Sequence, residues 1–129
     1  MTRYGRFIGT VQTEWLHERG KDRQMRLLRD FFFVDRRGIM WSAPAGSIVD
    51  GASIPRVFWR LCDPFIGDYR QASVVHDVAC QRREHASADV HRMFYEAMRA
   101  GGVRPVQAFL MWAAVRLFGP RFSGGWRRT

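Results

Sequence analysis

The chain has 129 residues, 47% of them hydrophobic, and a formal net charge of +9. This length suits one domain, and this apolar content is enough to bury a core without disulfides. A composition of this kind excludes an intrinsically disordered chain. We therefore expect a single domain over residues 1–129, rich in strands over 1–50 and rich in helices over 55–119.

The basic charge is carried almost wholly by arginine, because Lys21 is the only lysine. Two interpretations remain open: a codon bias toward arginine, or a partner rich in phosphate or carboxylate, which guanidinium groups bind well. The arginines are scattered from Arg3 to Arg128 and form no long basic run. The charge therefore indicates, at most, weak and salt-sensitive binding of nucleic acid.

The two cysteines, Cys62 and Cys80, have neither C-x-x-C nor zinc-site spacing, so we expect free thiols. The N-terminus lacks an apolar stretch long enough for a signal peptide. No segment approaches the roughly 20 apolar residues that a transmembrane helix needs. We therefore expect neither a signal peptide nor a transmembrane segment.

Three runs rich in β-branched and aromatic residues predict strands, at 7–16, 24–34 and 39–43. Short charged turns that contain Gly20 and Gly38 separate these runs. Short turns between strands favour an antiparallel meander of about three to four strands at the N-terminal side.

Helix signals dominate the second half. Ser53 followed by Pro55 is typical of a helix start and predicts a short helical turn through Phe58. Ser87 has the residue type of an N-cap for a later helix. Apolar periodicity and end signals predict three longer helices, at 69–82, 87–99 and 105–118. The expected fold class is thus α+β, with an antiparallel meander followed by three α-helices.

The third helix is apolar on every side, because only Gln107 and Arg116 are polar between residues 106 and 118. A helix of this kind is either buried or meets a partner. At 1.5 Å per residue it covers roughly 20 Å, which is too short to cross a bilayer. We expect a central core helix, with self-association or a protein or membrane contact through 106–118 as the alternative.

His76, Asp77 and Asp89 form the candidate reaction centre. Helical periodicity directs His76 inward and turns Asp77 toward a polar edge of the same helix. Asp89 opens the next helix, and an antiparallel helix pair would bring it beside His76. A carboxylate behind a histidine fixes its tautomer and raises its basicity, as a general base requires. The alternative is structural: Asp89 stabilises a helix start, and His76 is a satisfied core residue.

A second polar cluster, with Asp50, Ser53 and Arg56 as candidate binding residues, precedes the short helix. Asp50 and Asp77 are also weak candidate ligands for a hard cation, for which a turn at Asp50 would supply free carbonyl groups. The alternative is that this cluster caps the helix. The other histidines fit no zinc pattern, so we expect them on the surface, with His91 as a secondary ligand candidate: His17, His85 and His91.

Several motifs follow one another in a specific order: Asp50-Gly-Ala-Ser-Ile-Pro-Arg, Phe58-Trp59, His76-Asp77, Ala88-Asp89 with Phe94, and Gly102-Val103. This order resembles a family found mostly in phages and prophages and catalogued as a domain of unknown function (number 1353). The likeness covers roughly residues 27–126. It implies a phage or prophage origin and does not supply an activity.

His76-Asp77 on one helix and Ala88-Asp89 with Phe94 on the next are similar to the His-Asp pattern of secreted and parvoviral phospholipases A2. That resemblance implies that His76 activates water, Asp77 holds calcium and Asp89 orients His76. The chain departs from the pattern at Cys80, where both enzyme families usually have tyrosine. It also lacks their calcium loop.

These observations lead us to expect a small phage- or prophage-encoded protein that is a non-enzymatic virion component or a binder of a host or defence factor. The alternative is a metal-assisted hydrolase with a phospholipase-A2-like His-Asp site and calcium as its cofactor. A weak nucleic-acid binder is a third possibility. The expected location is the cytoplasm of the bacterial host or the virion.

Overall fold

A computed structural model describes residues 3–17, 24–50, 54, 56–58, 60 and 67–123. Six strands precede the helices: β1 (Gly5–Ile8), β2 (Thr13–His17), β3 (Gln24–Leu27), β4 (Phe31–Asp35), β5 (Met40–Ala43) and β6 (Ile48–Val49). They form two antiparallel three-stranded sheets, one in the order β1-β4-β5 and the other in the order β2-β3-β6. The predicted α+β class, with antiparallel strands before the helices, is confirmed.

The structure corrects the length of the strands. The predicted strands 7–16 and 24–34 are each divided in two, because β1 pairs with β4 while β2 pairs with β3. Gly9 ends β1 with a φ of 90°, which side-chain-bearing residues rarely adopt. Asp30 ends the turn between β3 and β4, and its carboxylate accepts the backbone N–H of Ala45 at 2.8 Å. Three consecutive segments of the chain, β1–β2, β3–β4 and β5–β6, therefore bend between the two sheets. Each segment contributes one strand to each sheet.

Strands β3, β4 and β5 each bury one face. In β4, Phe31 and Phe33 are fully buried, and the alternate residues are only partly so. Burial of each such aromatic ring stabilises the fold by roughly 2–3 kcal/mol. Asp35 lies on the same face, where its carboxylate accepts the indole N–H of Trp41 and the backbone N–H of Ile39, both at 3.0 Å. The buried Asp35 carboxylate thereby sets the turn between β4 and β5.

Three α-helices follow two short 3-10 turns: η1 (Arg56–Phe58), η2 (Gly67–Tyr69), α1 (Arg70–Arg82), α2 (Ser87–Ala100) and α3 (Pro105–Phe118). The three predicted long helices are confirmed to within one residue at each end. Ser87 is the first residue of α2 rather than its N-cap, which is Ala86. Ser53 lies outside the described residues. Among the described helices, none combines the length and hydrophobicity that spanning a membrane would demand.

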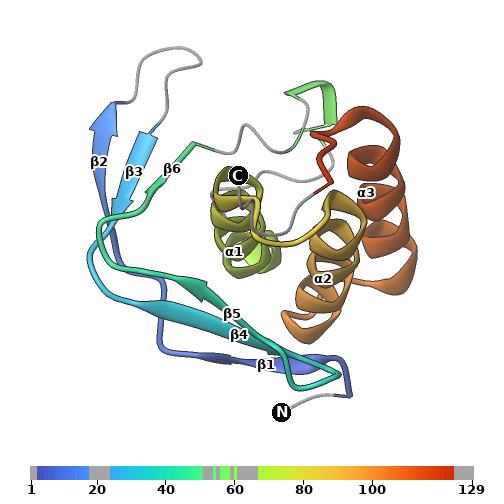
Figure 1. The fold of residues 1–129 in the computed structure, drawn as a ribbon, viewed down its shortest axis with the longest axis horizontal. Coiled ribbons are helices and arrows are strands. Elements are labelled where there is room, and N and C mark those ends of the chain that lie inside the picture. The colour runs from blue at the N-terminus through green and yellow to red at the C-terminus, as the bar shows by residue number, and fades with distance from the viewer. Residues whose placement is uncertain are drawn as a thin grey trace.

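The two sheets meet at an angle, and α1 lies within that angle (Figure 1). Contacts of α1 with β4, β5 and β6 join it to both sheets, while α2 packs on β1 and β4. The outermost helix is α3, which packs mainly against α2. The core therefore lies between the sheets and the α1–α2 pair.

The expectation that residues 106–118 form a central core helix is wrong. Four residues on one side of α3 are buried: Ala108, Met111, Ala114 and Val115. On the other side, Val106, Phe109, Leu110 and Leu117 are between 49% and 70% exposed. The reason is that α1 and α2 already cover the sheets, so among the described elements α3 packs against neighbours on one flank only.

Candidate functional site

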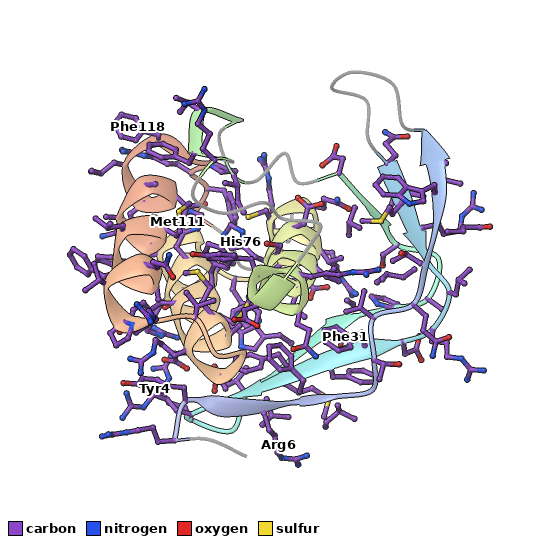
Figure 2. The ribbon with its side chains drawn as sticks, turned by 180° about the vertical axis from the view of Figure 1, so that it is seen from behind. Tyr4, Arg6, Phe31, His76, Met111 and Phe118 are labelled. Atoms are coloured by element: carbon purple, nitrogen blue, oxygen red, sulfur yellow. The ribbon has the colours of Figure 1, made fainter. Side chains whose placement is uncertain are left out.

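A pair of buried histidines joins α1 to α2. His76 faces the interior, as helical periodicity predicts, and is fully buried (Figure 2). Its ring stacks on Phe94 of α2 with the centroids 4.3 Å apart. Its Nε2 atom lies 2.9 Å from Nδ1 of His91, which is also buried. His76 thus finds its partner on the second helix in a histidine rather than in a carboxylate.

The direction of this hydrogen bond follows from the next one. Nε2 of His91 lies 2.9 Å from the carbonyl oxygen of Pro120, which only accepts. In a neutral His91 the proton therefore resides on Nε2, and Nδ1 is left as an acceptor. His76 then donates its Nε2–H to His91, and His91 donates its Nε2–H to Pro120. The relay links α1, α2 and the chain that follows α3.

Burial keeps both rings neutral. It lowers the pKa of His76 well below its usual value of 6.5, and the proximity of His91 lowers it further. Burial likewise lowers the pKa of His91; the Pro120 hydrogen bond opposes this shift, and the charges of Arg116 and Arg121 add to it. Two neutral imidazoles are what the relay needs, and neutral imidazole is also the form that binds metals.

Cys80 lies one helical turn after His76 on the same face of α1. Its Sγ atom is 3.7 Å from Nε2 of His76. Burial raises the pKa of the Cys80 thiol to about 12, and the negative charge of Asp77 contributes. The thiol is consequently protonated at neutral pH and, without a metal, is a poor nucleophile.

The structure corrects the expected position of Asp77. Asp77 does not face a polar edge, because it is only 3% exposed. One oxygen of its carboxylate accepts the backbone N–H of Asp50 at 3.0 Å and the side-chain amide of Gln81 at 3.3 Å. Gln81 also donates to the carbonyl of Ile48, in β6. Strand β6 covers this side of α1, so Asp77 ties the helix to the end of the strand.

Asp89 lies apart from this network. Its carboxylate forms an ion pair with Arg92 at 3.0 Å, and its side chain is 47% exposed. The structure thus brings Asp77 to the backbone of Asp50 and His76 to His91, while the described contacts of the Asp89 carboxylate are with Arg92. Ser53 and the side chain of Arg56 lie outside the described residues, so the expected binding cluster is described at Asp50 alone.

The expectation that His91 lies on the surface is wrong, since it is 1% exposed. A signal for its burial was present in the sequence. His91 precedes Phe94 by three residues and Met98 by seven, a spacing that places all three on one helix face. His85, by contrast, is only partly buried, and its ring lies 4.3 Å from that of Trp41.

One described cavity reaches His91, the outer member of the histidine pair. It has a volume of about 220 Å³ and is lined by Ser87, His91, Arg116, Leu117 and Arg121. Its two guanidinium groups make it a cationic environment, which suits a small anion. The cavity gives solvent or an anion access to the side of the histidine pair formed by His91.

A family model described as "Protein of unknown function (DUF1353)" matches residues 25–115. The chain belongs to this family. Two uncharacterized proteins of Sinorhizobium fredii are similar to it. The protein y4jT is 46% identical over 75% of this chain and 29% of its own length, and y4iH is 38% identical over 79% of this chain and 44% of its own length.

The chain thus spans less than half the length of these curated relatives. No solved structure matches it. The segment that matches the DUF1353 model runs from β3 through most of α3 and contains the complete His76–Cys80–His91 cluster. The family description carries no activity, so function has to be argued from the geometry of the site and the surface.

Proposed function

We propose that this protein is a non-enzymatic binding module that docks an acidic amphipathic helix of a partner protein on α3. The docking surface, here called the α3 face, consists of Val106, Phe109, Leu110 and Leu117. Their large exposed fractions are the observation that carries the proposal. An apolar surface that is contiguous rather than scattered is characteristic of an interaction site.

The residues of the α3 face lie along one side of the helix. Its members lie three, four and eleven residues after Val106, the spacing of a single stripe on an α-helix. At 1.5 Å per residue the stripe is roughly 17 Å long, which suits a helix laid along it. Figure 2 shows Met111 directed toward the other helices and Phe118 at the outer margin. The apolar residues of α3 therefore face two ways, and in the part of the chain that the structure describes only one side is covered.

Charge selects the kind of partner. The segment 104–121 contains three arginines, Arg104, Arg116 and Arg121, and no acidic residue. A second copy docked on the α3 face would bring like charges together, in a chain whose net charge is already +9. An apolar helix flanked by glutamate or aspartate would bury the stripe and neutralise these arginines. A heterologous acidic partner is therefore favoured over self-association.

The interior supports a non-enzymatic function. The ring of His76 stacks on Phe94 and is hydrogen-bonded to His91. The Asp77 carboxylate accepts hydrogen bonds from the backbone of Asp50 and the side chain of Gln81. These are the contacts of groups that lock helices to each other and to a strand. We place the protein, as a proposal, in the phage or prophage setting, as a virion component or a binder of a host or defence factor. Both of these functions require an exposed docking surface.

The binding proposal is tested with two synthetic amphipathic peptides that share an apolar face of leucines. One has glutamate on its polar face and the other has lysine. Fluorescence anisotropy should show that the wild-type protein binds the acidic peptide and not the basic one. Leu110→Asp should weaken binding about tenfold or more, as expected for a residue central to an interface.

Leu28→Asp is the matched control, because Leu28 lies outside α3 and is 50% exposed against 49% for Leu110. It should bind the acidic peptide as the wild type does. Equal binding of both peptides, or equal loss in both variants, would contradict the proposal. A stable dimer in light scattering that Leu110→Asp dissociates would show that a second copy occupies the α3 face. A salt-sensitive shift with duplex DNA that Leu110→Asp leaves unchanged would favour nucleic-acid binding instead.

The second candidate is a calcium-assisted hydrolase in which His76 is the base, Asp89 orients it, and Asp77 with Asp50 holds the cation. The observation in its favour is the cavity of about 220 Å³ that reaches His91 and, through it, the histidine pair. It requires the wild-type protein to hydrolyse phospholipid vesicles or a nitrophenyl ester with calcium present, and His76→Ala to abolish that activity. We expect no hydrolysis with or without calcium.

A further inference from the structure

We propose that His76, Cys80 and His91 form a binding site for a transition-metal ion of the zinc type, which ties α1 to α2. The three side chains offer two imidazole nitrogens and one sulfur, and these atoms lie within 4.8 Å of one another in the interior. This inference is independent of the docking proposal, because the α3 face contains none of these residues.

The choice of metal follows from the donor set. Imidazole and thiolate are the ligands of Zn²⁺ and of related borderline-soft ions, while calcium and magnesium take oxygen ligands. Three protein ligands leave one of four tetrahedral positions for water or an anion. His76 and Cys80 come from positions one turn apart on α1, and His91 comes from α2. A metal ion held by this set would cross-link two helices.

The geometry is close to that of an occupied site. Bond lengths of zinc sites imply ligand separations of roughly 3.6 Å for nitrogen to sulfur and roughly 3.3 Å for nitrogen to nitrogen. The distance from Sγ of Cys80 to Nε2 of His76 is 3.7 Å, which already fits. The distance from Nε2 of His76 to Nδ1 of His91 is 2.9 Å, so the two rings must separate by roughly 0.4 Å. The Cys80 sulfur and the His91 nitrogen lie within 4.8 Å of each other, compared with roughly 3.6 Å in an occupied site.

His91 has the surroundings of a metal ligand. Metal-binding histidines commonly donate their second N–H to a carbonyl or a carboxylate, which fixes the tautomer and the ring orientation. The 2.9 Å hydrogen bond from Nε2 of His91 to the carbonyl of Pro120 does this and directs the lone pair of Nδ1 at the cluster. The backbone of Pro120 thus holds His91 in the orientation that a metal requires.

The protons of the binding step balance. Cys80 releases its thiol proton to solvent and becomes a thiolate ligand. His76 stays neutral, because its proton moves from Nε2 to Nδ1 and frees Nε2 for the metal. His91 is already the required tautomer. A divalent ion with one thiolate leaves a charge of +1, which a small anion as fourth ligand would neutralise.

The test uses full-length protein stripped with a chelator and titrated with Co²⁺ and then with Zn²⁺. We expect one equivalent of Co²⁺ to give the near-ultraviolet thiolate-to-cobalt charge-transfer band and the intense visible bands of tetrahedral coordination. Zn²⁺ should displace the cobalt and raise the Tm of the protein in a concentration-dependent way. Cys80→Val should lose the charge-transfer band, and His91→Gln should weaken Zn²⁺ binding by about 100-fold.

Two control variants separate this site from incidental binding. Cys62→Ala removes the chain's only other thiol, and His85→Ala removes a histidine outside the cluster. Both should retain the cobalt spectrum and the stoichiometry. Circular dichroism of each metal-free variant checks that it is folded. The proposal is overturned if the wild type binds no metal, if the charge-transfer band persists in Cys80→Val, or if the band disappears in Cys62→Ala.

Discussion

The Nε2 atom of His76 lies 2.9 Å from Nδ1 of His91, and this hydrogen bond between two buried rings connects α1 to α2. The bond matters for stability because His91 also donates to the carbonyl of Pro120 at 2.9 Å. A residue of similar size without polar atoms at position 91 would remove the His91 partner of both the His76 imidazole and the Pro120 carbonyl.

We therefore predict that His91→Leu lowers the free energy of unfolding of the metal-free protein by about 2–4 kcal/mol, since each unsatisfied buried group costs about 1–3 kcal/mol. Urea unfolding followed by circular dichroism measures the change. His85→Leu, at a partly exposed position, should cost less than about 1 kcal/mol. Equal losses in the two variants would show that the relay through His91 contributes nothing particular.

Stability should fall on mild acidification. The pKa values of His76 and His91 are lowered in the folded protein, so the unfolded chain, with values near 6.5, binds protons first as the pH drops. The stability that the two neutral histidines contribute is fully present above about pH 6.5 and is lost progressively below it. The free energy of unfolding then falls with a slope that approaches about 1.4 kcal/mol per pH unit for each histidine.

Urea unfolding at several pH values between 7.5 and 5.5 measures this slope. Glu96 has the opposite effect nearer pH 4.5, because burial raises its pKa above that of the unfolded chain and the folded state takes up the proton first. His91→Gln should flatten the slope, while His85→Ala should leave it unchanged. Stability that is flat over this range in the wild type would contradict the neutral, buried pair.

The features that were predictable from the sequence have local signals. Pro105 occupies the first turn of α3, and apolar periodicity marks α1 and α2, so the helix bounds followed from residues close in the chain. The bend that divides the strands was not predictable, because it depends on Gly9 and on a long-range contact of Asp30 with Ala45.

The candidate site depended on packing that no periodicity reveals. Asp77 lies on a polar stripe of α1, yet it is buried where β6 packs against this helix. The inward position of His91 follows from its helical spacing with Phe94 and Met98, and not from the histidine alone. The helix at 106–118 is apolar all round, and this pattern gives no information on which side a neighbour covers.

Asp77 should be a structural residue rather than a calcium ligand. Asp77→Ala removes the acceptor for Asp50 N–H and for Gln81, so we predict a loss of about 2 kcal/mol in unfolding free energy. Asp77→Asn keeps an acceptor oxygen and should lose about half as much. Asp89→Ala breaks only a half-exposed ion pair and should cost less than about 1 kcal/mol.

The effect of calcium on the Tm tests the alternative function of Asp77, as a ligand for the cation. A ligand that binds the folded state raises the Tm, and the rise increases with the ligand concentration. We expect millimolar calcium to leave the Tm of the wild type and of Asp77→Asn unchanged. A rise in the wild type that is absent in Asp77→Asn would favour the calcium-assisted hydrolase over the binding module.

Two neighbouring residues of α3 should differ strongly in how much stability the same substitution costs. Leu110 is 49% exposed on the α3 face, while Met111 is 1% exposed against the helix pack. Leu110→Gln should therefore change the free energy of unfolding by about 0.5 kcal/mol or less, and Met111→Gln should lower it by about 3 kcal/mol. Both changes are measured by urea unfolding of the isolated protein.

The exposed leucine is assigned to binding if Leu110→Gln leaves the free energy of unfolding unchanged and also abolishes binding of the acidic peptide. This outcome is expected because the α3 face is apolar without stabilising the fold. A loss of stability at Leu110 equal to that at Met111 would mean that α3 is covered on both sides, and the docking surface would not exist.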